Sequence, residues 1–162
     1  MELFLEQRLQ ITGHVPRHMG RLVIHTHGVP KEKAYKRLLD MYAERLQSRG
    51  VRVECHPSKL SPEDYVNRLF ETGGSLMLLD EAGLVEDSLA FAQRFEGWQL
   101  TNHTTHLAIG PAEGWPSLEG LRSVPRLSLS PMTFPHELAA VVLVEQVYRA
   151  SEVLRGSGYH KA

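Results

Sequence analysis

Short apolar runs alternate with amphipathic segments along most of the chain. Between the apolar runs, hydrophobic residues recur every three or four positions, which is typical of helices that bury one face. Strands that alternate with helices indicate an α/β fold with a parallel sheet, in which ligands bind at the carboxyl ends of the strands. Strands are predicted at residues 21–27, 51–55, 75–80, 105–109 and 126–129.

Capping residues and glycines mark the expected ends of the helices. Ser61, followed by Pro62, predicts a helix start, because serine caps a helix and proline fits its first turn. Asp87 or Ser88 caps the next helix, and Gly50 and Gly156 end two others. The predicted helices begin near residues 31, 61, 88, 117 and 135.

Residues 1–20 differ from the rest of the chain. They are polar and contain Gly13, Pro16 and two histidines, and Met19 stands just before the first predicted strand. We expect an N-terminal extension here that is either disordered or foreign to the natural protein. Residues 21–162 are then expected to form one domain.

The composition is that of an ordinary globular protein. The chain has 162 residues, of which 42% are hydrophobic and 23% charged, and this length suits one domain with one sizeable core. No apolar run approaches the roughly 20 residues of a membrane span, and no secretory signal is visible. Cys55 is the only cysteine, so an intramolecular disulfide is excluded. A cytoplasmic protein is the simplest interpretation.

The net charge of −1 does not by itself indicate a nucleic-acid-binding protein. Charge is nevertheless distributed unevenly, with a basic excess over residues 31–52 and an acidic excess over residues 60–100. The basic segment is either a face that attracts RNA or simply a solvated helix surface.

Three segments near the C-terminus carry a recognisable signature. They are residues 127–136 (LSLSPMTFPH), 145–150 (EQVYRA) and 158–161 (GYHK). Together they closely resemble the C-terminal signature of the ribosomal RNA large-subunit pseudouridine N3-methyltransferases, a family of the SPOUT superfamily. Residues 78–80 and the glycine-rich residues 109–114 fall where that family has its cofactor loops. The resemblance spans roughly residues 21–162 and is strongest after Leu107.

The resemblance implies a fold and an activity that periodicity alone does not predict. The expected fold is an α/β SPOUT domain whose C-terminal part forms a deep trefoil knot, a rare feature in proteins. The expected activity is methylation of N3 of a pseudouridine in large-subunit (23S) ribosomal RNA, within the assembled ribosome and with S-adenosylmethionine as the methyl donor. The expected assembly is a homodimer in which the partner completes each active site.

The resemblance also predicts the residues that hold the cofactor. Small residues and free backbone amides suit such loops, because backbone hydrogen bonds read the adenine edge. Without the resemblance, the same segments pass for ordinary strand-to-helix turns. The predicted cofactor-binding residues are Leu79, Gly110, Leu129, Ser130, Pro131, Met132, Thr133 and Phe134.

Methylation of an imide nitrogen requires that its proton be removed or that the resulting anion be stabilised. Glu145 and Arg149 are four residues apart on one predicted helix, so they form either a structural pair or a site in which Arg149 holds a phosphate or base. The tail combines the ring of Tyr159, the imidazole of His160 and the charge of Lys161. Such side chains can stack on a flipped-out base and bind a phosphate beside it. The candidate catalytic residues are His136, Glu145, Arg149, Tyr159 and His160, and the candidate RNA-binding residues are Arg149, Tyr159, His160 and Lys161. Which residue is the base stays open.

The sequence departs from the family pattern at four places. Pro111 replaces the second of two adjacent glycines, which removes one backbone donor. Gly83 is followed by leucine where lysine is common. Ala140 stands where the family commonly has an arginine early in the last helix, and Gly158 replaces a proline before the Tyr-His pair.

Other functions compete with this interpretation. The histidine pairs His25/His27 and His103/His106 resemble metal-ligand spacings, but no cysteine or acidic residue accompanies them at a suitable spacing, so we expect no metal. The alternatives are a SPOUT enzyme that acts on another RNA, such as a transfer RNA 2′-O-methyltransferase, and a non-catalytic relative that binds RNA or the ribosome.

Overall fold

The computed structural model describes residues 21–161. The extension predicted over residues 1–20 lies outside the described residues. Within the described part, no helix is long and apolar enough to cross a bilayer.

Five parallel strands form one sheet in the order β2-β1-β4-β3-β5. Every predicted strand is present and the α/β class is confirmed; the trefoil knot stays a prediction. The strands are β1 (Leu22–His27), β2 (Val51–His56), β3 (Ser75–Val85), β4 (Thr105–Ala108) and β5 (Arg126–Ser128).

Strand β3 is longer than predicted. Its pairing with β5 shifts register between Leu79 and Leu84, so the strand continues past Asp80 to Val85. At Gly83 a Cβ atom would lie 2.6 Å from the backbone of Arg126, so only glycine fits this close approach. The sequence pattern missed the extension because the residues after Asp80 do not form an apolar run.

Four of the five predicted helices are present, with ends close to those that the local chemistry predicts, whereas the short helix expected near residue 117 is a single 3₁₀ turn. The Ser61 hydroxyl accepts a hydrogen bond from the Asp64 amide at 3.0 Å, and the Asp87 carboxylate caps its helix through the Ala90 amide at 2.8 Å. Gly156 ends the last helix in the left-handed conformation, at φ 71°. The helices are α2 (Lys33–Leu46), α3 (Pro62–Phe70), α4 (Ser88–Gln99) and α5 (His136–Arg155), with 3₁₀ turns η1 (Gln47–Arg49) and η2 (Glu119–Leu121).

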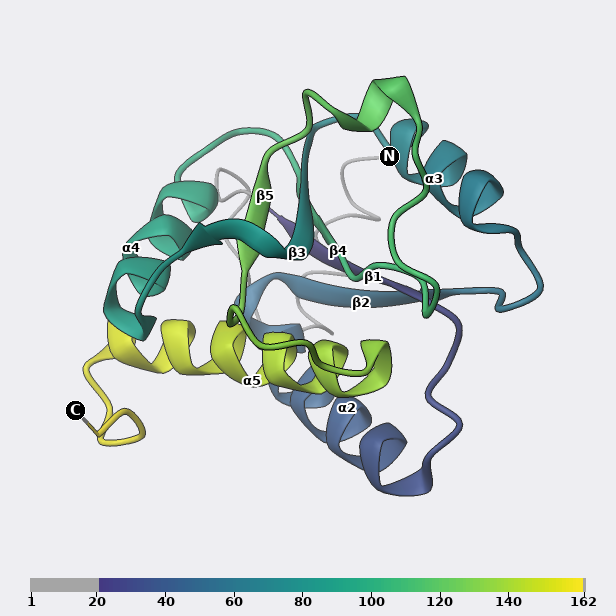
Figure 1. The fold of residues 1–162 in the computed structure, drawn as a ribbon. Helices are drawn as coiled ribbons and strands as arrows, with labels where there is room; N and C mark the ends of the chain where they lie inside the picture. Colours follow the sequence, from purple (N-terminus) through teal and green to yellow (C-terminus); the bar gives the residue numbers. More distant parts are fainter. Residues whose placement is uncertain (1–20, 162) are drawn as a thin grey trace, which may run out of the picture.

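The helices form a layer on each face of the sheet (Figure 1). Helix α5 packs between α2 and α4 on one face, over a core that includes Ile24, Leu107 and Val144. Helix α3 and η2 cover the opposite face, where Tyr65 and Leu78 lie in a smaller core. Residues 79–81 of β3 and the loops after β4 and β5 form the candidate site.

Candidate active site

A cavity of about 660 Å³ opens at the carboxyl edge of the sheet. Residues 79–81 of β3 and the loops that follow β4 and β5 surround it, and the first turn of α5 closes one side. The volume is that of a typical small-molecule site. The lining residues are Leu79, Asp80, Glu81, Ile109, Gly110, Pro111, Ala112, Gly114, Trp115, Leu129, Ser130, Met132, Thr133, Phe134, Pro135, His136 and Ala139.

Seven of the eight predicted cofactor-binding residues line this cavity. Pro131 is the exception: it is exposed and does not line the cavity. Among the predicted catalytic residues, His136 also lines it, at the first position of α5. The structure therefore brings together residues that are up to 57 positions apart in the chain, from Leu79 to His136. Their role in cofactor binding stays a prediction.

One wall of the cavity is built by an aromatic stack. The Trp115 indole N–H donates to the Leu79 carbonyl at 2.9 Å, and the Tyr65 ring stacks on Trp115 with centroids 6.0 Å apart. The Tyr65 hydroxyl donates to the Ile109 carbonyl at 2.7 Å, and burial raises the pKa of this phenol. A Cβ atom at Gly110 would lie 3.1 Å from the indole nitrogen, so this glycine lets the loop lie against the ring.

Short polar contacts order the remaining loops. The Ser130 hydroxyl accepts from the Met132 amide at 3.0 Å, and the Thr133 hydroxyl donates to the Glu81 carboxylate. Pro111 lacks an N–H, but its carbonyl accepts from the Gly114 amide at 2.9 Å and closes the turn. The loop thus keeps its shape despite the departure from the family pattern. The first amides of α5 have no intrahelical acceptor, so the end of the helix beside the cavity favours an anionic group.

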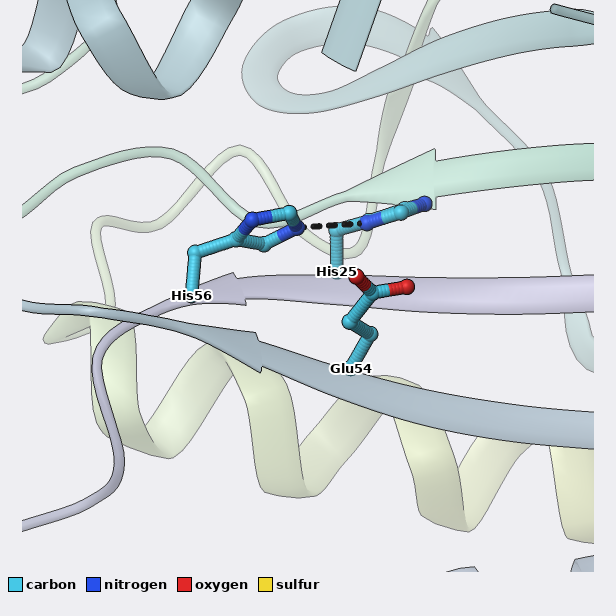
Figure 2. A group of neighbouring side chains, drawn as sticks. All are labelled: His25, Glu54 and His56. Atoms are coloured by element: carbon cyan, nitrogen blue, oxygen red, sulfur yellow. Dashed lines mark hydrogen bonds between the residues drawn. The ribbon is translucent and has the colours of Figure 1, made fainter. Parts of the chain in front are cut away.

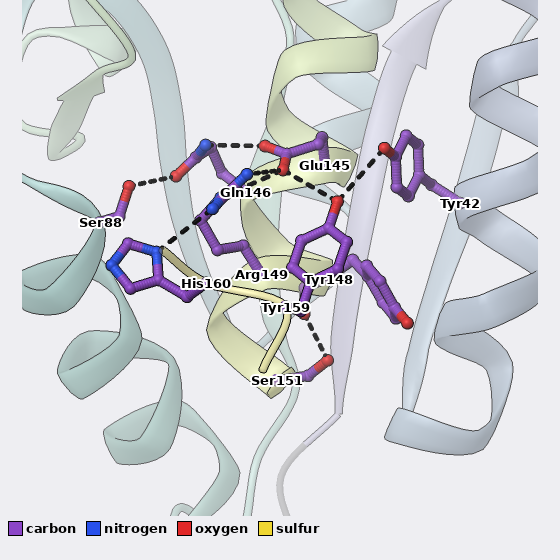
Figure 3. A network of polar contacts seen from close by, with 9 residues as sticks. All are labelled: Tyr42, Ser88, Glu145, Gln146, Tyr148, Arg149, Ser151, Tyr159 and His160. Carbon is purple, nitrogen blue, oxygen red and sulfur yellow. Dashed lines mark hydrogen bonds and ion pairs between the residues drawn. The ribbon is translucent and has the colours of Figure 1, made fainter. Parts of the chain in front are cut away.

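A second group, which includes four of the predicted catalytic residues, lies along the carboxyl-terminal half of α5 (Figure 3). We call it the tail network. It consists of Tyr42, Ser88, Glu145, Gln146, Tyr148, Arg149, Ser151, Tyr159 and His160.

The Glu145 carboxylate is the centre of the tail network. One oxygen accepts from Arg149 Nε at 3.1 Å, from Arg149 Nη2 at 2.6 Å and from the Tyr159 hydroxyl at 3.1 Å. The other oxygen accepts from the Gln146 amide at 2.7 Å. Four donors therefore contact this one carboxylate, and Glu145 organises the network.

The last residues of the chain are held against α5. Arg149 Nη1 donates to His160 Nδ1 at 3.2 Å, and because arginine has only donor groups, Nδ1 is the acceptor in this contact. The Tyr159 ring packs edge-on against Tyr148, with Arg149 5.1 Å from its centroid. Burial and the hydrogen bonds with Tyr42 and Glu145 raise the pKa of Tyr159, which therefore stays protonated. Tyr159 and His160 are half-buried, whereas Lys161 is exposed.

The predicted catalytic residues therefore form two groups within one chain. His136 and Glu145 are nine positions apart on α5, which separates them by about 13 Å along the helix axis. Four of the five predicted residues meet in the tail network, and the fifth lies at the cavity. Ala140 lies between them in the core with 2% of its surface exposed. That position contributes apolar packing here, where an arginine would need a buried partner.

Sequence analysis missed several residues of these two sites. Glu81 was missed because its strand was expected to end at Asp80; its acidic side chain directly after that strand was the available signal. Trp115 was missed as a cavity wall, although it directly follows the glycine-rich loop. Tyr42 comes from α2, and nothing in its sequence context indicates that its hydroxyl lies 3.4 Å from that of Tyr159.

Comparison with known proteins places the chain in a family. Residues 21–160 match a family described as "Predicted SPOUT methyltransferase". The chain is 38% identical over 126 residues to the ribosomal RNA large subunit methyltransferase H of Synechococcus sp. (strain CC9605), covering 76% of this chain and 85% of that protein. Proteins of the same name from Gluconacetobacter diazotrophicus and Protochlamydia amoebophila are each 35% identical, over 142 and 145 residues. These alignments cover 83% and 88% of this chain, and 93% and 100% of the two relatives. The chain belongs to the SPOUT methyltransferase family.

Proposed function

We propose that this protein transfers a methyl group from S-adenosylmethionine to N3 of a pseudouridine in large-subunit ribosomal RNA. The observation that carries the proposal is the cavity at the carboxyl edge of the sheet, lined by seven of the eight residues predicted for the cofactor. The relatives' shared name, ribosomal RNA large subunit methyltransferase H, supports the RNA substrate. The resemblance of residues 127–161 supports the pseudouridine.

The residues of the cavity fit this cofactor. S-adenosylmethionine supplies its methyl group from a positively charged sulfonium centre. Apolar walls from Leu79, Ile109 and Trp115 suit the adenine ring. The Glu81 carboxylate and the amino-terminal end of α5 offer opposite charges for the amino and carboxylate groups of the methionine part.

The acceptor nitrogen must lose a proton as the methyl group arrives. Arg149 uses three of its five N–H groups within the tail network, on Glu145 and His160. The remaining two are available to the carbonyl oxygens beside N3, where they stabilise the imide anion. The Glu145 carboxylate already accepts four hydrogen bonds, Tyr159 stays protonated, and His160 Nδ1 already accepts from Arg149, so the His136 imidazole is the group suited to carry the proton away.

We further propose that the tail network of one subunit completes the cavity of its partner. Within one chain, about 13 Å of helix separates His136 from Glu145, too far for both to contact one base. A twofold dimer brings the same two surfaces together reciprocally.

Methyl transfer to ribosomes tests the activity. Ribosomes from a strain that lacks the modification are incubated with the protein and radiolabelled S-adenosylmethionine, beside protein-free 23S RNA and transfer RNA. We expect label in the 23S RNA of assembled ribosomes, located by mass spectrometry as N3-methylpseudouridine. Label in transfer RNA would establish another RNA target. Cofactor binding without transfer to any RNA would favour a non-catalytic relative.

Mixing two inactive variants tests the shared site. In a mixed dimer of Gly110→Val and Arg149→Ala, one site carries both changes and the other carries neither, provided that each site uses two chains. Half of the dimers are mixed after exchange at equal concentration, so about a quarter of the wild-type activity should return. If each site lies within one chain, no activity returns.

A further inference from the structure

Three buried histidines form a chain of hydrogen bonds away from the cavity. We call His25, His56 and His106 the histidine cluster. His25 Nδ1 lies 2.8 Å from His56 Nε2, and His25 Nε2 lies 2.8 Å from His106 Nδ1. The exposed fractions of the three side chains are 0%, 4% and 5%. Histidines with so little exposure are uncommon, and nothing in the proposed methyl transfer uses them.

The register of the sheet places a carboxylate beside this cluster. His25 on β1 lies directly opposite Glu54 on β2, and His27 lies opposite His56. Side chains two positions apart on a strand share a face, so Glu54 and His56 both lie on the face of His25 (Figure 2). Cys55, which lies between Glu54 and His56, points to the opposite face of the sheet. There it packs against the larger core, which includes Ile24.

The donor atoms are close enough to share one ion. The ligating atoms of His25, Glu54 and His56 all lie within 4.8 Å of one another. In a tetrahedral site with bonds of roughly 2.0–2.1 Å, ligand atoms are about 3.3 Å apart. Only a small movement is needed, and Glu54 is free to make it, since 45% of its side chain is exposed.

The Glu54 carboxylate supplies the negative charge that a cation needs at this place. Its ion pair with Arg52, at 3.6 Å, is exposed and therefore weak enough to exchange for a metal ion. The two imidazoles each offer a ring nitrogen as a neutral ligand.

The third histidine has the geometry of a supporting residue. When His25 Nδ1 and His56 Nε2 both present lone pairs, the proton of His25 must lie on Nε2, where it donates to His106 Nδ1. Such a contact fixes the tautomer and ring orientation of a metal-bound histidine. His106 Nε2 is buried and has no hydrogen-bond partner among residues 21–161. The hydrogen bonds of the described residues therefore do not satisfy every ring nitrogen of the histidine cluster.

We propose that His25, Glu54 and His56 bind a divalent first-row transition metal ion of the Zn²⁺ type, with His106 orienting His25. Two imidazoles and one carboxylate suit such an ion, whereas Mg²⁺ and Ca²⁺ prefer all-oxygen sites. Three protein ligands leave one position open toward the solvent side of Glu54. The ion links β1 to β2 and thereby stabilises this edge of the sheet. The spacings of His25/His27 and His103/His106 did not reveal the site, because its ligands come from two different strands. Glu54 and His56 follow His25 by 29 and 31 positions in the sequence.

Cobalt titration of the full chain tests this site. The protein is treated with a chelator, dialysed, and titrated with Co²⁺, whose visible absorption reports ligand number and geometry; Zn²⁺ is then added as a competitor. We expect one Co²⁺ per chain, displacement by Zn²⁺, and a higher melting temperature with either ion.

Three variants assign the ligands. Glu54→Gln changes an exposed side chain, so it leaves the fold intact, and His56→Asn removes a buried ligand. Each should weaken Co²⁺ binding at least about tenfold. His103→Ala, which changes an exposed histidine bonded to Ser75, is the matched control and should bind as the wild type does. Absence of Co²⁺ binding in the wild type, or unchanged affinity in Glu54→Gln, would overturn the proposal.

Discussion

The cavity and the histidine cluster share one sheet, yet they are assembled in different ways. Most residues of the cavity come from three short stretches of the chain, residues 79–81 in β3, residues 109–115 after β4 and residues 129–136 after β5, in which only Glu113 and Pro131 do not line it. The histidine cluster is formed inside strands, and its members are single residues from β1, β2 and β4. A continuous stretch is visible as a motif. A cluster that depends on register becomes visible only when the strands are paired.

The two regions nevertheless touch through one side chain. Tyr65 packs edge-on against His56, with ring centroids 5.3 Å apart, and stacks on Trp115 in the cavity wall. Its hydroxyl holds the Ile109 carbonyl at the mouth of the cavity. Three substitutions test the two regions separately. Gly110→Val alters the cavity, His25→Val alters the histidine cluster, and Tyr65→Phe alters the contact between them.

The largest expected effect comes from Gly110→Val. A Cβ atom at this position already lies 3.1 Å from the Trp115 ring, and the added methyl groups force the loop away from it and narrow the cavity. A displacement of about 1 Å near a reacting group costs roughly 100-fold in activity, so kcat/KM for methyl transfer should fall by about that factor. Calorimetric titration with S-adenosylmethionine should show weaker binding, while Co²⁺ affinity stays unchanged.

Gly97→Ala is the matched control for this change. Gly97 lies in α4 with no atom within 4 Å of an added Cβ, so alanine should stabilise the helix slightly and leave activity alone. Wild-type activity in Gly110→Val would show that the cavity is not the cofactor site.

The histidine cluster should produce the next largest effect, on stability in mild acid. The ordinary pKa of His25 is 6.5 and its folded pKa is lowered by burial to about 3, so the unfolded chain binds more protons between these values. The stabilisation is complete above pH 6.5 and is lost as the pH falls toward 3. Between pH 7 and pH 5 this residue alone lowers the free energy of unfolding by about 2 kcal/mol.

Urea denaturation in the presence of a chelator, at pH 7, 6 and 5, measures this dependence. Carboxylates contribute little in that range, because their ordinary pKa values are near 4. His25→Val removes the titrating group, so its stability should depend on pH less steeply than that of the wild type, whatever its absolute value. If the free energy of unfolding depended on pH equally steeply in the wild type and in His25→Val, folding would not favour the neutral form of His25.

The sequence predicted the fold better than it predicted the sites. All five strands were predicted from short apolar or alternating segments between turn-forming residues, and the caps at Ser61 and Asp87 marked two helix starts. The end of β3 was missed, since pairing with β5 and not hydrophobicity holds residues 81–85 in the sheet. Physical pattern alone did not single out the residues that line the cavity; the resemblance predicted a set of eight, of which seven line it.

The separation along α5 also could not be read from the sequence pattern. The candidate catalytic residues were grouped by chemistry, and helix geometry places His136 at the cavity and Glu145 more than two turns away. The network around Glu145 depends on the path of the chain after Gly156, which returns Tyr159 and His160 to the helix. Local propensity does not encode that return.

The smallest expected effect is that of Tyr65→Phe, at the contact between the two regions. The substitution keeps the ring stacked on Trp115 and removes only the donor to the Ile109 carbonyl, which is left buried without that partner. The free energy of unfolding should fall by about 1 kcal/mol. Tyr35→Phe on α2 is the matched control, because Tyr35 packs against the larger core on the other face of the sheet, away from Tyr65. If Tyr65 only supports the two regions, the affinities for S-adenosylmethionine and Co²⁺ stay within about twofold of wild type. If both affinities fall together while the control keeps them, Tyr65 couples the regions, and the cavity and the histidine cluster then act as one energetic unit despite their different construction.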